Sequence, residues 1–491
     1  MEELLLLQRA LNRDHLPLDG SSNLDQRALQ LAEYLRRAKV ATDEGAAEAL
    51  GVDRNGTHYR KIRQRLKTAL INGLTLTARP PGSETGPGGA QSATAWKYFY
   101  LSISPGLRDY PRLSEQYLRE AIKMAEQSKL PQVTMLAARI LRRRAAEPAA
   151  SPADYEHYSA VYQRAKARYL GMAGMQDKLW DVKRLRIDES DPARVVAYVD
   201  DALANLLVRQ EEGLQAPLRY VSAYLRAVKH NTEGRYERTV SLAAETSAGE
   251  DSVGAVTADA YAEFLVQVAI AHLHLGDHDT VERIGRELAV VTAAPDNQMQ
   301  QLMIVNEFRA GRYDKARERL TGLAPAYLRE LPPRARERYE IYRGYLQVLG
   351  HLGAVADASG SAPVPFRMKK FLNEFSEASK DKTNLNVHLL VIRLIDGILH
   401  VSEERALPST EAVERYVYRY LNDGYSERGK LFLRALLQLV RDAPDAFQQG
   451  AELLGRIRGL PVNTYRFPNT EIVPYHILWD LLVHRLTGRT D

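Results

Sequence analysis

A short signature recurs three times in the middle of the chain. GRYERTV begins at Gly234, GDHDTVE at Gly276 and GRYDKAR at Gly311, which gives spacings of 42 residues (234 to 276) and 35 residues (276 to 311). Each copy follows an apolar helical segment and precedes another one. Glycine allows a helix to end in a tight turn, and the aromatic or histidine residue two positions later can pack inside the hairpin. The signature therefore predicts a row of stacked helical hairpins.

The rest of the chain is also helical by its period. In THYRKIRQRLKTAL, apolar side chains recur at three- and four-residue steps and basic side chains occupy the other faces. Ser151-Pro152 and Asp191-Pro192 each place a capping side chain before a proline at the first helical position. No alternating β-run is found, so the predicted fold class is all-α.

Two segments rich in proline, glycine and serine divide the chain. RPPGSETGPGGAQSATA, at 79–95, has no apolar periodicity and is predicted to be a flexible linker. DASGSAPVPF, at 357–366, is a second break. The expected organisation is an N-terminal helical unit at 1–78, repeats at 96–356 and a C-terminal helical unit at 367–491.

The hairpin signature resembles the tetratricopeptide repeat, which has a period of about 34 residues. The usual tryptophan and closing proline are largely absent, and the spacing is irregular. The residues that fit the pattern are Gly234, Tyr236, Gly276, Gly311, Tyr313 and Ala316. The resemblance implies a degenerate tetratricopeptide-like solenoid.

The last 125 residues or so carry a second resemblance. KKFLNEFSEASKDKTNLNVHLLVIRLIDGIL (369–399), RYVYRYL (415–421) and EIVPYHILWDLL (471–482) resemble the tail of an uncharacterised helical, tetratricopeptide-like family from Bacteroidetes-type bacteria. This resemblance implies an all-helical cytoplasmic protein and supplies no reaction. The residues themselves predict a final capping helix with an apolar stripe, made of Ile472, Val473, Tyr475, Leu478, Trp479 and Leu482.

The segment ALGVDRNGTHYRKIRQRLKTAL, at 49–70, resembles a helix-turn-helix module in the order and length of its parts. Seven lysine and arginine residues and no acidic residue lie between Arg54 and Arg79. If this segment binds DNA, we expect Asn55, Arg60 and Gln64 to reach base edges and Lys61, Arg63 and Lys67 to contact phosphates. Thr57 is expected to cap the basic helix and to face outward beside them. The alternative, which base rates favour, is a helical hairpin with a solvated or protein-docking basic face.

The 26 tyrosines outnumber the nine phenylalanines. A tyrosine can pack its ring in a hairpin while its hydroxyl stays at the surface, and such residues can anchor a partner peptide. Candidate partner-binding residues in the repeats are Tyr224, Tyr236, Tyr261 and Tyr313. For each of them, packing in the core is the favoured alternative.

Other patterns favour structure over chemistry. GYSERGKL, at 424–431, fits the phosphate-loop spacing, but Leu431 replaces the required hydroxyl and a helical segment precedes it where a strand is needed. His272, His274 and His278 do not share one helix face, so no metal site is expected there. The absence of cysteine removes thiolate zinc sites and thiol nucleophiles. We therefore expect no catalytic residues, no cofactor and no metal.

The predicted function is recognition of a protein or peptide by a stacked-helix surface, without enzymatic activity. The alternative is a transcriptional regulator that binds DNA through 42–70 and uses the repeats as a sensor. The net charge of +5 is mild for 491 residues and excludes neither hypothesis. No run of 18 apolar residues and no secretory signal is found, so a cytoplasmic protein is expected. The sequence does not predict the oligomeric state.

Overall fold

The computed structural model describes most of the chain as helices and the turns between them. The described residues are 1, 4–5, 8, 26–38, 41–77, 87–103, 111–148, 151–188, 191–207, 214–247, 255–291, 297–355, 385–400, 410–421, 427–441, 445–460 and 471–488. Within these ranges there are 21 helices and no strand. The all-α prediction is confirmed, and the segment at 357–366 lies outside the described residues.

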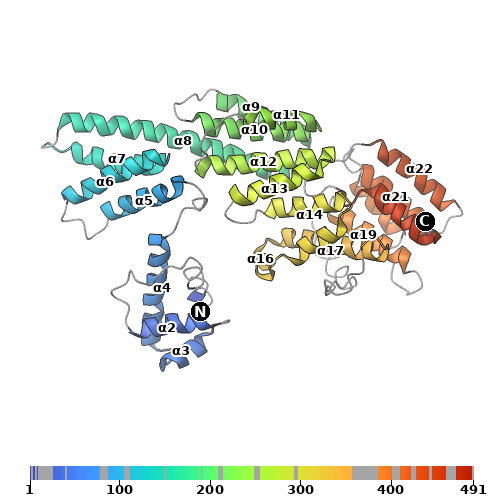
Figure 1. The fold of residues 1–491 in the computed structure, drawn as a ribbon, viewed down its shortest axis with the longest axis horizontal. Coiled ribbons are helices and arrows are strands. Elements are labelled where there is room, and N and C mark those ends of the chain that lie inside the picture. Colours follow the sequence, from blue (N-terminus) through green and yellow to red (C-terminus); the bar gives the residue numbers. More distant parts are fainter. Residues whose placement is uncertain are drawn as a thin grey trace. The chain divides into compact units, whose positions relative to one another are not determined.

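The chain divides into two compact units, Met1–Tyr169 and Leu170–Asp491 (Figure 1). The first unit holds α2 (Gln26–Arg37), α3 (Asp43–Leu50), α4 (Thr57–Thr77), α5 (Pro87–Ser102), α6 (Pro111–Gln127), α7 (Pro131–Ala145) and the start of α8 (Pro152–Asp188). Helix α5 begins inside the segment 79–95 that was predicted to be a linker, because Pro87 suits the first turn of a helix.

The first unit contains two separate apolar clusters. Residues of α2, α3 and α4 share one cluster, centred on Leu31, Leu35 and Leu66. Residues of α5, α6, α7 and the first turns of α8 share another, which includes Leu118 and Val133.

The second unit contains the end of α8 and all later helices. These are α9 (Pro192–Leu207), α10 (Gln215–Thr232), α11 (Tyr236–Ser247), α12 (Ala255–Leu275), α13 (His278–Val291), α14 (Asn297–Arg309), α15 (Tyr313–Thr321), α16 (Pro325–Glu330), α17 (Pro333–His351), α19 (Leu385–Leu399), α20 (Thr410–Tyr420), α21 (Glu427–Val440), α22 (Ala446–Arg458) and α23 (Tyr475–Thr487). Asp191 caps α9 as predicted, since its Oδ1 accepts from Ala193 N at 2.9 Å.

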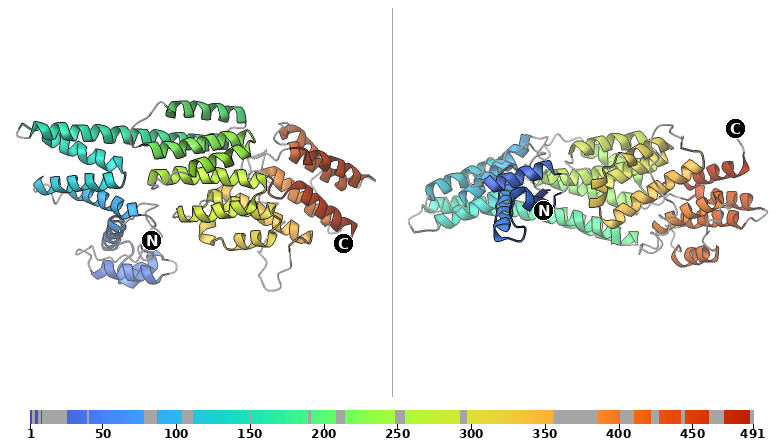
Figure 2. Two further views of the ribbon diagram at one scale, coloured as in Figure 1. Left: turned by 45° about the horizontal axis from the view of Figure 1, so that its top comes forward. Right: turned by 90° about the horizontal axis from the view of Figure 1, so that it is seen from below.

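Helices that follow one another in the second unit pack against each other. The contacts join α9 to α10, α10 to α11 and α12, α12 to α13, α14 to α15, and α17 to α19. Figure 2 shows these helices lying side by side in chain order. One apolar cluster runs from Met175 to Leu482, and it includes residues of both 96–356 and 367–491.

Four turns in the second unit have the same backbone geometry. Gly234, Gly276, Gly311 and Gly353 have φ values of 74, 76, 70 and 77°. At each turn the amide after the glycine donates to a carbonyl five residues earlier, at 2.8, 3.0, 2.9 and 2.9 Å, for α10, α12, α14 and α17 respectively. This is the Schellman helix end, which favours glycine because other residues are strained at positive φ. Three of the four turns were predicted from the signature.

Candidate functional site

Helices α3 and α4 follow one another across a short turn, and both pack against α2. Thr42 caps α3, since its Oγ1 accepts from Gly45 N at 3.1 Å, and Gly51 ends the helix at a φ of 61°. Helix α4 then begins at Thr57. The stripe predicted from the spacing is Tyr59, Ile62, Leu66, Ala69 and Leu70, and all of these residues are buried except Ala69, which is half-buried. The apolar stripe fixes the rotation of α4 and leaves its basic side chains on the opposite faces.

Most of the candidate DNA-contacting residues lie on the exposed side of α4 and the turn before it. The exposed members are Asn55, Thr57, Arg60, Lys61 and Gln64, whereas Arg63 and Lys67 are half-buried. Arg63 is bound within the protein, because its Nη1 lies 2.9 Å from Asp43 Oδ1.

Asp43, in the first turn of α3, holds α3 and α4 together. Its Oδ1 also accepts a hydrogen bond from the Tyr59 hydroxyl at 2.8 Å. Burial on its own would raise the pKa of Asp43, but the Tyr59 hydroxyl and the Arg63 guanidinium outweigh it and hold that pKa below its usual value. Arg54 forms a further ion pair with Glu44. Arg63 and Arg54 are thus engaged within the hairpin, and Arg60 and Lys61 are the basic residues best placed to meet a ligand.

The four candidate tyrosines are less exposed to solvent than residues of a docking surface need to be. Tyr224 is fully buried and Tyr313 is 8% exposed, so both pack in the core of the second unit. Tyr236 stacks on His274 with ring centroids 4.7 Å apart. The hydroxyl of Tyr261 donates to Glu287 on the neighbouring helix. Only Tyr236 and Tyr261 retain part of their surface, and the burial of the other two supports the core alternative.

An exposed tryptophan was missed in the sequence. Trp180, in α8, is 62% exposed, while Met175, Leu179 and Val182 of the same helix are buried in the apolar cluster. These three residues follow one helical stripe, and Trp180 falls outside it. The helical spacing of the apolar residues therefore indicates that Trp180 is exposed. A tryptophan in such a helix is nevertheless usually assigned to the core, because its side chain is large and apolar.

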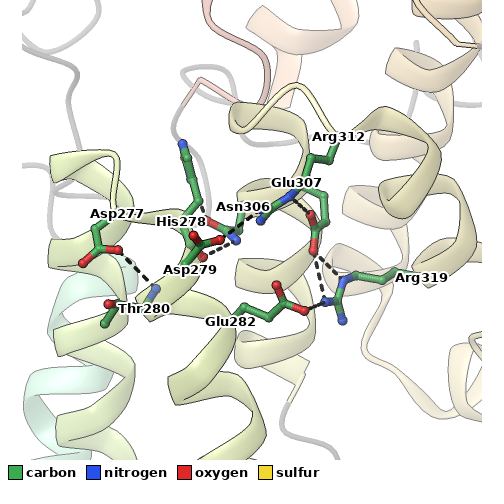
Figure 3. A network of polar contacts seen from close by, with 9 residues as sticks. All are labelled: Asp277, His278, Asp279, Thr280, Glu282, Asn306, Glu307, Arg312 and Arg319. Atoms are coloured by element: carbon green, nitrogen blue, oxygen red, sulfur yellow. Dashed lines mark hydrogen bonds and ion pairs between the residues drawn. The ribbon is translucent and has the colours of Figure 1, made fainter.

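The polar residues of the second and third signature copies join neighbouring hairpins (Figure 3). Glu307, near the end of α14, is fully buried and binds Arg312 Nε at 2.7 Å and Arg319 Nη2 at 3.0 Å. Asn306 binds the main-chain carbonyl of His278 at 3.1 Å and its ring Nδ1 at 2.8 Å. Two guanidinium groups pair with the Glu307 carboxylate, so this network ties the end of α14 to α15.

The three histidines around the Gly276 turn have separate partners. His272 Nδ1 lies 3.0 Å from Asp277 Oδ2, and His278 Nδ1 lies 2.8 Å from Asn306 Oδ1. His274 stacks on Tyr236, and Arg309 Nη1 lies 3.5 Å from its Nδ1. The three rings are thus held apart by different neighbours.

The phosphate-loop lookalike is helical where the structure describes it. Helix α21 begins at Glu427, so Gly429 and Lys430 lie in its first turns, and Lys430 Nζ pairs with Glu427 Oε2 at 3.2 Å. A helical backbone directs its amides along the helix axis and cannot wrap around a phosphate as a phosphate loop does.

His274 gives the second unit a predicted sensitivity to acid. Burial, with Arg309 close by, lowers the pKa of His274 well below its usual value, so the ring is neutral in the folded protein. The unfolded chain binds a proton at this residue below about pH 6.5. Stability is therefore retained above pH 6.5 and lost as the pH falls, by up to about 1.4 kcal/mol per pH unit for this group.

The measurement is thermal unfolding of the full chain at pH 7.5 and pH 5.5. We expect His274→Phe, which keeps an aromatic ring against Tyr236, to lose less stability between these pH values than the unchanged protein. His484→Phe is the control, because it makes the same substitution at an exposed histidine of α23. Equal acid sensitivity of His274→Phe and the unchanged protein would contradict the prediction.

Comparisons of the chain with models of protein families, with curated proteins and with solved structures found no match. Among the described helices, none combines the length and the apolar character needed to cross a membrane.

Proposed function

We propose that this chain is a non-enzymatic, tetratricopeptide-like repeat protein that recognises another protein or a peptide through its stacked helices. The observation that carries the proposal is the set of four equivalent helix ends in one apolar cluster, at Gly234, Gly276, Gly311 and Gly353. Repeated hairpins of this kind stack into an extended surface, and repeat proteins commonly use such surfaces to bind partners.

Trp180 is the residue of the second unit that we propose as an anchor for the partner. Tryptophan is enriched among the side chains that dominate binding energy, and this one is 62% exposed. Tyr236 and Tyr261 remain secondary candidates because part of each side chain reaches the surface.

The test is photo-crosslinking of the full chain in a nuclease-treated lysate. A photoreactive phenylalanine derivative at position 180 should give one discrete crosslinked protein, and the same group at Tyr155, which is 40% exposed in the first unit, serves as the control. Once the partner is known, Trp180→Ala should weaken its binding about 30-fold, the effect of losing about 2 kcal/mol. Crosslinks that are equally diffuse at both positions would contradict the proposal.

A second candidate function is DNA binding by the N-terminal unit, as in a regulator whose repeats act as a sensor. The specific observation that favours it is the exposed position of Arg60 and Lys61 on α4, opposite the buried stripe. Side chains so placed can meet the phosphates of a duplex.

Fluorescence anisotropy of the full chain with a mixed-sequence duplex tests this second function. If it holds, affinity falls linearly with salt on logarithmic axes, and Arg60→Ala/Lys61→Ala reduces the slope by about 2. Arg36→Ala/Arg37→Ala removes the same charge from α2, where both arginines pair with Glu33, and should change the slope less. Equal slopes for the two double variants would exclude α4 as the DNA-contacting helix.

A further inference from the structure

One histidine–carboxylate cluster in the second unit takes no part in the proposed recognition surface. His351 is the last residue of α17, Asp396 lies in α19, and His400 directly follows the end of α19. One ring nitrogen from each histidine and one carboxylate oxygen all lie within 4.8 Å of one another. Asp396 is buried and the two histidines are half-buried, so the cluster is a constrained set of ligand-type side chains.

The separations are close to those of a metal site. Asp396 Oδ1 lies 3.7 Å from His351 Nδ1, and one ring nitrogen of His400 lies within 4.8 Å of a ligand atom of each of the other two residues. Ligand atoms at about 2.0–2.1 Å from a tetrahedral ion lie about 3.3 Å from each other. Small side-chain rotations are therefore sufficient to bring one atom of each residue to bonding distance of a shared ion.

Neighbouring groups fix how the two imidazoles are presented. His400 Nδ1 donates to the main-chain carbonyl of Asp396 at 2.8 Å, which leaves Nε2 of this ring as the nitrogen with a lone pair. His351 Nε2 lies 2.9 Å from Gln347 Nε2, so the amide nitrogen faces the ring in the structure. Rotating this amide by 180° presents its oxygen to Nε2–H, and Nδ1 of His351 then has its lone pair toward Asp396. Such hydrogen bonds are the usual outer support of metal-binding histidines.

The helix ends also favour a cation. Helices α17 and α19 pack together, and both reach their C-termini at this cluster. The C-terminal end of a helix carries partial negative charge, so two ends and one carboxylate attract a positive ion. Imidazole ligands favour zinc and similar transition metals over magnesium or calcium, which prefer oxygen.

We propose that His351, Asp396 and His400 form a binding site for a divalent transition-metal ion, with zinc as the expected occupant, that joins the end of α17 to the end of α19. The site spans the described residues on either side of 356–384, so a bound ion closes a long segment of the chain. Zinc bound only by the folded state then stabilises the second unit.

The test is zinc binding by the full chain after removal of metal with a chelator. Isothermal titration with zinc chloride should show one site, and a cobalt titration should show visible absorption from a cobalt ion with nitrogen and oxygen ligands. His351→Ala/His400→Ala should weaken zinc binding on the order of 100-fold or more, and Gln347→Ala on the order of 10-fold. The control, His58→Ala/His484→Ala, removes two exposed histidines and should retain the site.

A variant that fails to fold is distinguished by its circular dichroism, and Asp396→Asn supplies a near-isosteric change that also removes a ligand charge. Loss of the cobalt absorption in a folded Asp396→Asn variant supports the site. The proposal is overturned if the unchanged protein binds no zinc. It is also overturned if His351→Ala/His400→Ala binds zinc with the same affinity as the unchanged protein.

Discussion

Replacing Arg428 by methionine will lower the stability of the second unit by about 3–5 kcal/mol. Arg428, at the start of α21, is buried and pairs with both carboxylate oxygens of Glu471, with Nη2 at 3.1 Å from Oε2. Its Nη1 also donates to the carbonyls of Ile457 and Leu460 at the end of α22. Methionine leaves Glu471 as a buried charge without this partner and leaves these carbonyls without a donor.

Thermal or denaturant unfolding of the full chain measures this loss. Arg456→Met is the matched control, because Arg456 is 65% exposed and its contact with Glu427 is 4.0 Å long, so the expected change is below about 1 kcal/mol. Arg428→Met/Glu471→Leu should be less destabilised than the sum of its two single variants, since the pair is removed together. If Arg428→Met is as mild as Arg456→Met, the ion pair does not stabilise the fold.

Two glycines of α22 should respond to alanine in opposite directions. A Cβ at Gly450 would lie 2.0 Å from Cη2 of Trp479, a rigid and buried ring in α23, whereas a Cβ at Gly455 meets nothing within 4 Å. Alanine stabilises an exposed helix position by about 0.5–1 kcal/mol relative to glycine. Overpacking typically costs about 1–3 kcal/mol, which exceeds that gain.

We therefore expect Gly455→Ala to raise the melting temperature of the second unit and Gly450→Ala to lower it. The free energies of unfolding of the two variants should differ by about 2–3 kcal/mol. Trp479→Leu in the Gly450→Ala background provides the check on the cause. Removing the ring should make the alanine substitution at 450 less costly than it is beside tryptophan. A cost at 450 that does not depend on Trp479 would show that the close approach of these two helices is not the reason.

The sequence predicted the features that depend on local period. The stripe of α4 and the final stripe from Ile472 to Leu482 are buried as expected, because helix rotation follows directly from residue spacing. The turns at Gly234, Gly276 and Gly311 were also found, since only glycine adopts their backbone conformation without strain.

What was missed depends on contacts between distant segments. Gly353 ends α17 with the same geometry, but no aromatic signature follows it. The sequence around Glu307 does not indicate that this residue is fully buried. From sequence alone, its partners Arg312 and Arg319 have the pattern of ordinary surface charges. The pair Asp396 and His400 has helical four-residue spacing, yet the third member, His351, comes from another helix.

The division between 1–78, 96–356 and 367–491 was drawn from composition. The structure divides the chain into two compact units at a position within α8, between Tyr169 and Leu170, where composition gives no proline or serine break. Composition reports where a chain is polar and loosely patterned, and it does not report which helices share a core. For the same reason, the tyrosine count could not separate the buried Tyr224 from the half-buried Tyr236.

The buried Glu307 restricts which residues of the α14–α15 hairpin can change independently during evolution. Glu307, Arg312 and Arg319 all lie in this one hairpin, and both arginines pair with the buried carboxylate. Replacing either arginine alone would weaken the pairing of a buried charge, which is costly. The three residues are therefore expected to be kept or replaced together, whereas the apolar contacts between hairpins tolerate many substitutions.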